Sequence, residues 1–540
     1  MQKDLRVSRV AVYIAASIVV LGLVISFSIG GEPGQHVSTP DVSTAALVGE
    51  VPAVTVPDVE LPTTTLSGSA IAPEFDAVPG VVDVAAGSAV VADPSADSES
   101  TSDPGTDPEP TSTSAPASNL ASGSASPSGS APITVPGPTT STATDVVFVS
   151  SITGNDGNDG RTDETPWRSL QSSINRLQPG QTLYVMDGDY SEQREPGNPH
   201  YVVNVSGKPG SWIHIAAAPG HRPRLVPRSG NGISILGDYI EVSGLRIDGE
   251  TFDAANSYGW GILVRSSHHV RLTSNVISDM PVGGISAVES TNLEIYRNEV
   301  FGNSFWGTEQ GSGISIWHSR DHGTQSAADG YHDKIIGNII YGNENKVYSR
   351  WAPVSNAITD GNGIIIDEAS HFNYQGRTLI ANNVVFDNGA RGIIVWESAG
   401  VDVVFNTTFH NGRTAALTGA RVELAVGRST DCKLLNNVAW SRPGLAALTS
   451  VGTEKPTIGG NVFITDTPSG HETSLDLVTT ADPGMVAPST NRATADFHLV
   501  AGSILEARAV DIGPRVAVDA GGGSRPAVGA DVGAYELGAS

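Results

Sequence analysis

Apolar residues alternate behind a leading glycine at repeated places in the second half of the chain. Residues 363–368 (GIIIDE) match residues 392–397 (GIIVWE), and the corner that begins at Asn383 recurs 23 residues later at Asn406. This period is too short for a βαβ unit, which needs about 30 or more residues. Short β-branched strands between Gly and Asn turns fit one coil of a strand solenoid.

The asparagine corner can be followed along the chain at uneven intervals. Its positions are Asn275, Asn298, Asn338, Asn383, Asn406, Asn437 and, more weakly, Asn461. The longer intervals indicate insertions into a basic coil near 23 residues. Asparagine amides stacked inside turns satisfy backbone groups, so we interpret these residues as structural.

The alternation predicts which side chains of each glycine-led strand face the core. The more uniformly aliphatic set is taken as inward: Ile285, Ala287, Ile314, Ile316, Ile364, Ile366, Ile393 and Val395. The outer face then shows Trp317, Asp367 and Trp396 on successive coils, about 4.8 Å apart. Glu289, His318, Glu368 and Glu397 follow directly, one per coil.

Insertions fall on both sides of this repeated strand. Those before it include residues 303–311 and 343–362, and those after it include residues 319–333 and 369–378. Long loops within compact domains are usually functional, so we expect them to wall a groove over the outer face. Five tryptophans belong to this face or its rim: Trp260, Trp306, Trp317, Trp351 and Trp396. Sugar stacking and simple loop packing both account for them.

Carboxylates are the second chemical signal on this face. Asp360, Asp367, Glu368 and Glu397 lie on two neighbouring coils. Stacked like charges raise at least one pKa, which gives one proton donor and one ionised partner. Coils one or two apart place such groups about 5 or 9.6 Å from each other, within the range of retaining and inverting hydrolases. Turn capping is the structural alternative for each acid.

Other residues leave a lyase mechanism open. His318 could act as a base or bind a metal, and Arg391 is a candidate for substrate contact. Lys346, Arg350 and Arg391 are further candidates for the base of a lyase, which also needs a cation or Arg to neutralise the substrate carboxylate. Asp360, Asp367 and Glu368 offer the oxygen ligands that Ca²⁺ uses. The cofactor is otherwise unknown.

The folded region begins with a cap. Residues 146–150 form a predicted strand, and an Asn/Asp/Gly loop follows at residues 154–160. Apolar residues at helical spacing predict a helix over Trp167–Leu177, ended by Pro179-Gly180, before a strand at residues 182–186. One amphipathic helix before a strand solenoid would cover the open end of its core.

Three parts of the folded region resemble right-handed parallel β-helix proteins of the pectate lyase-like superfamily. They are the opening with FVS, GNDG, PW, PGQTLYV and GDY between residues 148 and 190, the stretch 206–225, and the C-terminal motifs DFHL and VGADVGAYE. The resemblance implies an all-β helix over residues 145–480 with a closing segment at 481–540. It also implies a polysaccharide lyase, glycoside hydrolase, epimerase or non-enzymatic adhesin.

The N-terminal quarter has a different character. Residues 1–9 carry Lys3, Arg6 and Arg9, and an apolar run follows to about Ile29. We expect residues 10–30 to be a transmembrane signal anchor with the rest outside the cell; a cleaved signal peptide is the alternative. Residues 31–144 contain no Lys or Arg and predict a disordered linker.

Charge and cysteine content exclude some classes of function. The formal net charge of −26 argues against nucleic acid as a partner. A single cysteine, Cys432, excludes an intramolecular disulfide and a Cys-based zinc site. We therefore expect a monomeric, membrane-anchored protein that acts on a polysaccharide or cell-envelope glycan. Hydrolysis is favoured over metal-dependent elimination, and a non-catalytic glycan binder is the third possibility.

Overall fold

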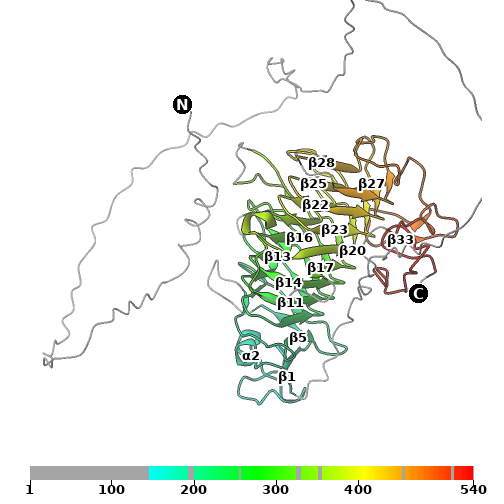
Figure 1. Ribbon diagram of the computed structural model, residues 1–540. Helices are drawn as coiled ribbons and strands as arrows, with labels where there is room; N and C mark the ends of the chain where they lie inside the picture. Colours follow the sequence, from blue (N-terminus) through cyan, green and yellow to red (C-terminus); the bar gives the residue numbers. More distant parts are fainter. Residues whose placement is uncertain are drawn as a thin grey trace, which may run out of the picture. The chain divides into compact units, whose positions relative to one another are not determined.

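The computed structural model describes residues 145–191, 200–254, 257–323, 330–350, 356–452, 456–511 and 516–538. Three parallel sheets, here called sheets 1, 2 and 3, stack coil upon coil (Figure 1). Each coil passes from sheet 2 to sheet 1 to sheet 3, so that consecutive strands belong to different sheets. The predicted right-handed parallel β-helix is confirmed.

The strands are short. Sheet 1 contains β1 (Val146–Val149), β2 (Thr182–Val185), β5 (Ile213–Ala217), β8 (Ile240–Ser243), β11 (His268–Thr273), β14 (Thr291–Tyr296), β17 (Tyr331–Ile336), β20 (Arg377–Ala381), β23 (Val401–Val404), β26 (Lys433–Leu435) and β29 (Thr457–Gly459). Sheet 2 contains β4 (Tyr201–Val203), β7 (Ile233–Ile235), β10 (Trp260–Arg265), β13 (Gly283–Val288), β16 (Ile314–Trp317), β19 (Ile364–Asp367), β22 (Ile393–Trp396), β25 (Leu424–Gly427) and β28 (Leu448–Val451). Sheet 3 contains β3 (Asp189–Tyr190), β6 (Arg224–Leu225), β9 (Arg246–Asp248), β12 (Val276–Ser278), β15 (Glu299–Phe301), β18 (Ile339–Tyr341), β21 (Val384–Phe386), β24 (Thr407–Phe409), β27 (Val438–Trp440), β30 (Val462–Ile464) and β31 (Leu477–Thr479).

The core lies inside the coils, and the predicted inward residues line it. Ile314, Ile316, Ile364 and Ile366 are all at most 1% exposed and belong to one continuous apolar cluster with their counterparts on the other coils. Ile365, which points the opposite way, belongs to a separate cluster outside sheet 2. Successive side chains of a strand point to opposite faces, so this division confirms the predicted strand register.

Two ladders of buried asparagine amides join the coils. In the first ladder, which follows sheet 1, both Asn298 N–H and its side-chain amide donate to Asn338 Oδ1 at 2.9 and 3.0 Å. Asn338 donates in the same way to Asn383, and the ladder ends on Asp476. The predicted structural role of these corners is confirmed. A second ladder, between sheets 3 and 2, runs through Asn303, Asn343, Asn388 and Asn411 to Glu423.

The predicted N-terminal helix covers the first coils but is shorter than expected. Helix α2 spans Leu170–Arg176, with Ser169 as its N-cap, and packs Leu170 and Ile174 into the core. Trp167 lies outside the helix because its N–H donates to the Phe148 carbonyl and so extends the strand contact of β1.

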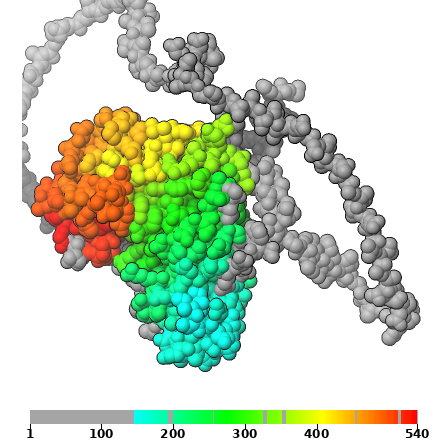
Figure 2. Space-filling model, turned by 180° about the vertical axis from the view of Figure 1, so that it is seen from behind, coloured from blue at the N-terminus to red at the C-terminus, as the bar shows by residue number. Residues whose placement is uncertain are grey.

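The C-terminal segment packs on the outside of the coils. Its two antiparallel strands, β32 (Met485–Ala487) and β33 (Asp496–Leu499), lie beside sheet 3. Phe497 and Val532 share an apolar cluster with Phe386 and Phe409, which are outward residues of that sheet. Figure 2 shows these orange and red residues against the yellow and green coils. The segment therefore covers a side of the β-helix.

The predicted anchor at residues 10–30 and the predicted linker at residues 31–144 lie outside the described residues. None of the helices in the described ranges combines the length and apolar character needed to cross a membrane.

Removing one amide from the first ladder should destabilise the whole solenoid. Asn338→Ala leaves the buried Asn298 amide groups and the Ile295 carbonyl without their partner. Each such group costs about 1–3 kcal/mol, so we expect a loss of about 3 kcal/mol in the free energy of unfolding, measured by thermal or denaturant unfolding. Asn175→Ala, on the exposed side of α2, is the control. Equal stability of the two variants would contradict the role of the ladder.

Candidate active site

The candidate site lies at the carboxyl ends of three neighbouring strands of sheet 2. Trp317 on β16, Asp367 on β19 and Trp396 on β22 occupy matched positions in the ladder. Val288 precedes them and Gly427 follows them in the same row. The row therefore places one carboxyl group between two indole side chains on adjacent coils.

The next residue of each coil turns the chain toward sheet 1 in a left-handed conformation. Glu289, His318, Glu368, Glu397 and Arg428 all adopt it, with φ between 45° and 55°. Glycine adopts this conformation without cost, but in these coils the chain uses charged or imidazole side chains. Their backbone N–H groups continue the parallel ladder, for example Glu368 N–H to the Trp396 carbonyl at 3.0 Å. The turn therefore aligns these side chains as a second row.

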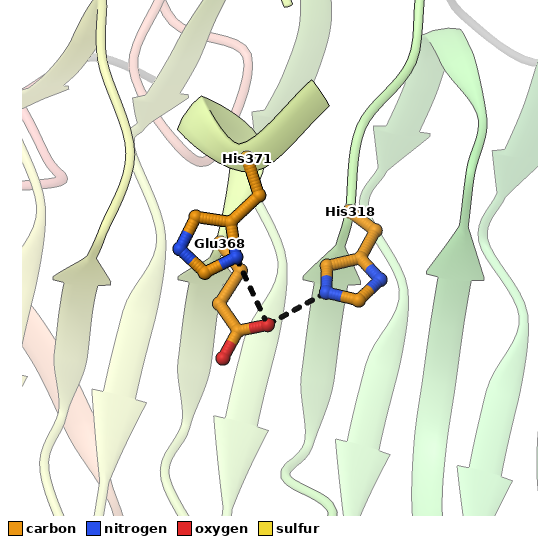
Figure 3. Close-up of side chains that lie close together, drawn as sticks. All are labelled: His318, Glu368 and His371. Carbon is orange, nitrogen blue, oxygen red and sulfur yellow. Dashed lines mark hydrogen bonds and ion pairs between the residues drawn. The ribbon is translucent and has the colours of Figure 1, made fainter. Parts of the chain in front are cut away.

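Two histidines converge on one oxygen of Glu368 (Figure 3). His318 Nε2 lies 2.6 Å from Glu368 Oε2, and His371 Nδ1 lies 3.6 Å from the same oxygen. His371 belongs to the short 3-10 helix η1 (Ala369–Phe372), which begins directly after Glu368. Within the described ranges, these three residues form a grouping with metal-ligand atoms all within 4.8 Å of one another.

Further contacts fix the orientation of this grouping. His371 Nε2 lies 2.8 Å from Glu397 Oε2, and the other oxygen of Glu397 accepts from Arg428 at 2.9 Å. The His318 ring stacks on Trp317 with centroids 3.7 Å apart, and Phe372 lies 4.7 Å away on another side. The rings therefore have little freedom to turn away from Glu368.

Asp367 has a different environment from its acidic neighbours. Its Oδ1 is buried and, among the residues that the structure describes, has no hydrogen-bond partner. Burial raises the pKa of Asp367 well above its ordinary value, and the charges of Asp360, Glu368 and Glu397 raise it further. A carboxyl group in such a position holds its proton at a higher pH than an ordinary aspartate does.

Glu368 is shifted in the opposite direction. The hydrogen bond with His318 is the main cause that lowers its pKa, and a hydrogen bond from the Trp317 side chain contributes. The pKa values of these adjacent carboxyl groups are thus shifted in opposite directions, which is a common arrangement of acid and base in active sites.

Asp360 and Arg391 precede β19 and β22 and so lie before the amino ends of these strands. The Asp360 oxygens accept from Thr359 and from the Asn362 amide, while Arg391 donates to the Thr359 carbonyl. Burial raises the pKa of Asp360, and the Arg391 charge opposes the shift. Within the described residues, Asp360, Asp367 and Glu368 do not form a grouping at ligand distances, although the sequence proposed them for Ca²⁺.

The tryptophans divide between the two ends of the strands. Trp317 and Trp396 lie in the row at the carboxyl ends, and the Trp396 ring lies over Gly427 of the next coil. Trp260 begins β10, and Trp306 precedes β16 with its N–H bonded to the Pro281 carbonyl, so neither belongs to this row. Trp351 lies outside the described residues.

Insertions flank sheet 2 on both sides, as predicted. After the strands, Asp321 accepts from Gln375 N–H at 3.0 Å, and the Arg320 guanidinium lies over the Phe372 ring at 4.6 Å. These contacts join the loops that follow β16 and β19. Residues 324–329 and 351–355 lie outside the described ranges, and the groove stays a prediction.

Two members of the site were missing from the candidates named from sequence. His371 lies three residues after Glu368, and the pattern Glu-x-x-His was the available signal. Arg428 follows Gly427 at the same repeat position as Glu397, so alignment of the coils would have found it.

Comparisons with known proteins give one family match and several similar solved structures. Residues 152–363 match a family described as "Protein of unknown function (DUF1565)", and the search of curated proteins found no match. Among solved structures, pectate lyase Pel9A is similar at 17% identity over 73% of this chain and 96% of that chain, with a TM-score of 0.42. A rhamnogalacturonan lyase is similar at 12% identity over 64% and 91%, with a TM-score of 0.42. The GH136 lacto-N-biosidase from Eubacterium ramulus is similar at 17% identity over 59% and 56%, with a TM-score of 0.39.

The three parallel sheets define the class of this chain as a right-handed parallel β-helix protein. More narrowly, residues 152–363 carry the likeness to DUF1565, a stretch that includes His318 and ends just before β19.

Gly427 should be required for the position of the Trp396 ring. A Cβ atom at Gly427 would lie 2.2 Å from Trp396 Cε3, well inside contact distance, while the backbone at this glycine is not left-handed. We expect Gly427→Ala to displace the ring and to lower the free energy of unfolding by about 1–3 kcal/mol, as seen by crystallography and thermal unfolding. Gly521→Ala, whose nearest contact would be 3.5 Å, is the control. An unmoved ring would contradict this packing.

Proposed function

We propose that the protein binds a polysaccharide across the carboxyl ends of β16, β19 and β22 and cleaves it there, with Asp367 as the proton donor. The observation that carries the proposal is the ladder in which Asp367 lies between Trp317 and Trp396. Indole rings offer flat apolar surfaces with a polar edge, and these suit the C–H faces of sugar rings.

Hydrolysis is the favoured reaction because it needs one protonated and one ionised carboxyl group. Asp367 has a buried oxygen without a hydrogen-bond partner in the described part of the chain, whereas Glu397 is paired with His371 and Arg428. Asp367 and Glu397 belong to adjacent coils about 4.8 Å apart, close to the spacing of about 5–5.5 Å in retaining glycosidases. Asp367 would protonate the leaving oxygen, and Glu397 would face the sugar carbon.

A metal-dependent polysaccharide lyase is the second candidate. Elimination requires a base and a cation that neutralises the substrate carboxylate, and the grouping of His318, Glu368 and His371 favours this reaction. The products separate the two candidates, because elimination leaves an unsaturated sugar that absorbs in the ultraviolet. Hydrolysis yields only new reducing ends.

We also propose that the protein is held at the outer side of a membrane by residues 10–30. The support is the apolar run behind Lys3, Arg6 and Arg9, since positive flanks stay in the cytoplasm. Fractionation of cells, followed by protease treatment of intact cells, tests this location. Recovery of the full chain from the soluble cytoplasmic fraction would contradict it.

Two substitutions should separate cleavage from binding. We expect Asp367→Asn to lower turnover by at least about 100-fold, because the proton donor is lost, while glycan retention persists. We expect Trp396→Ala to weaken retention about tenfold through lost stacking. The measurements are product analysis and retention on a broad panel of polysaccharides.

Asp163→Asn, in an exposed loop remote from sheet 2, is the matched control. If Asp367→Asn and Glu397→Gln leave function unchanged while Trp396→Ala abolishes retention, the protein is a non-catalytic glycan binder. If the wild-type chain neither cleaves nor retains any polysaccharide of the panel, the proposal fails.

A further inference from the structure

The three side chains drawn in Figure 3 have the composition of a transition-metal site. His318, Glu368 and His371 supply two imidazole nitrogens and one carboxylate oxygen, the donor set found in one class of zinc hydrolases. Ca²⁺ and Mg²⁺ take oxygen ligands instead. The donor types therefore favour a divalent first-row transition metal.

The spacing of the donor atoms also fits such an ion. Zinc bonds of about 2.0–2.1 Å in tetrahedral geometry place ligand atoms about 3.4 Å apart. The observed separations of 2.6 Å and 3.6 Å from Glu368 Oε2 lie on either side of this value. All three ligand atoms lie within 4.8 Å of one another.

The contacts that His371 makes beyond Glu368 are those expected of a metal ligand. A ligating histidine almost always bonds its second ring nitrogen to a carboxylate, a carbonyl or water. His371 presents Nδ1 to Glu368 while its Nε2 contacts Glu397 at 2.8 Å, and Arg428 holds Glu397 in turn. The tautomer with a free Nδ1 lone pair is thereby favoured.

The three side chains differ in how far they are exposed to solvent. The exposed fractions of the His318, Glu368 and His371 side chains are 13%, 24% and 44%. Three protein ligands leave at least one position for water or substrate, as in catalytic zinc sites.

We infer that His318, Glu368 and His371 form a binding site for a divalent first-row transition metal, with Glu397 as a positioning residue for His371. The inference goes beyond the proposed glycan cleavage and does not depend on it.

Co²⁺ is a suitable probe because its visible absorption reports ligand type and geometry. The full chain, freed of metal by a chelator, should bind one equivalent of Co²⁺, and Zn²⁺ should displace it while excess Ca²⁺ should not. We expect His371→Ala to weaken binding at least about 100-fold and Glu397→Gln about 10-fold. Metal should raise the melting temperature of the wild-type chain but not that of His371→Ala.

The control is His498→Ala, which removes an exposed histidine paired with Asp496 at 2.7 Å; it should bind Co²⁺ like the wild type. His371 is itself exposed, and circular dichroism checks that its variant folds. Absence of stoichiometric binding by the wild-type chain would overturn the inference, as would undiminished binding by His371→Ala or equal loss in His498→Ala. Unchanged affinity in Glu397→Gln would overturn its positioning role. Because no glycan is present, failure here is distinct from failure of the proposed cleavage.

Discussion

Main-chain hydrogen bonding between the in-register strands of sheet 2 is the constraint on which the site depends. It fixes Trp317, Asp367 and Trp396 at matched positions on adjacent coils. A slip of one residue would turn every side chain of a strand to the opposite face. Asp367 would then enter the core in place of Ile366, so the cost of burying its carboxyl group protects the register.

The asparagine ladders and the apolar core help to maintain this register. The asparagine ladders join each coil to the next through buried amide hydrogen bonds, and the apolar core fills the interior. The C-terminal segment packs outside sheet 3 and leaves sheet 2 to its own loops. The ladders, the core and the C-terminal segment thus stabilise the coils, while the candidate site lies on sheet 2.

Acidic side chains lie close together where the strands of sheet 2 end. Glu368 and Glu397 carry the histidine and arginine contacts, while the buried Oδ1 of Asp367 has no hydrogen-bond partner among the residues that the structure describes. The pKa of Asp367 is raised and that of Glu368 is lowered, and the same contacts gather ligands around Glu368. One cluster of side chains therefore supports both the proposed acid and the inferred metal site.

The repeat itself was readable from sequence because strand alternation and corner asparagines are local and periodic. It predicted the β-helix, the inward isoleucines, the structural asparagines and the row of Trp317, Asp367 and Trp396. The Ca²⁺ grouping was chosen by residue type alone, and Asp360 instead bonds within its own loop.

Only the tertiary structure decided how the non-repeating insertions contribute. Loops have no period, so their positions depend on contacts such as Gln375 with Asp321 and Arg320 with Phe372. Those contacts accompany the η1 turn that brings His371 to Glu368, whereas Trp260 and Trp306 lie toward the opposite ends of the strands. The sequence by itself determined the scaffold and one row of the site. Folding of the insertions determined which side chains join it, because loop contacts between coils are absent from any single repeat.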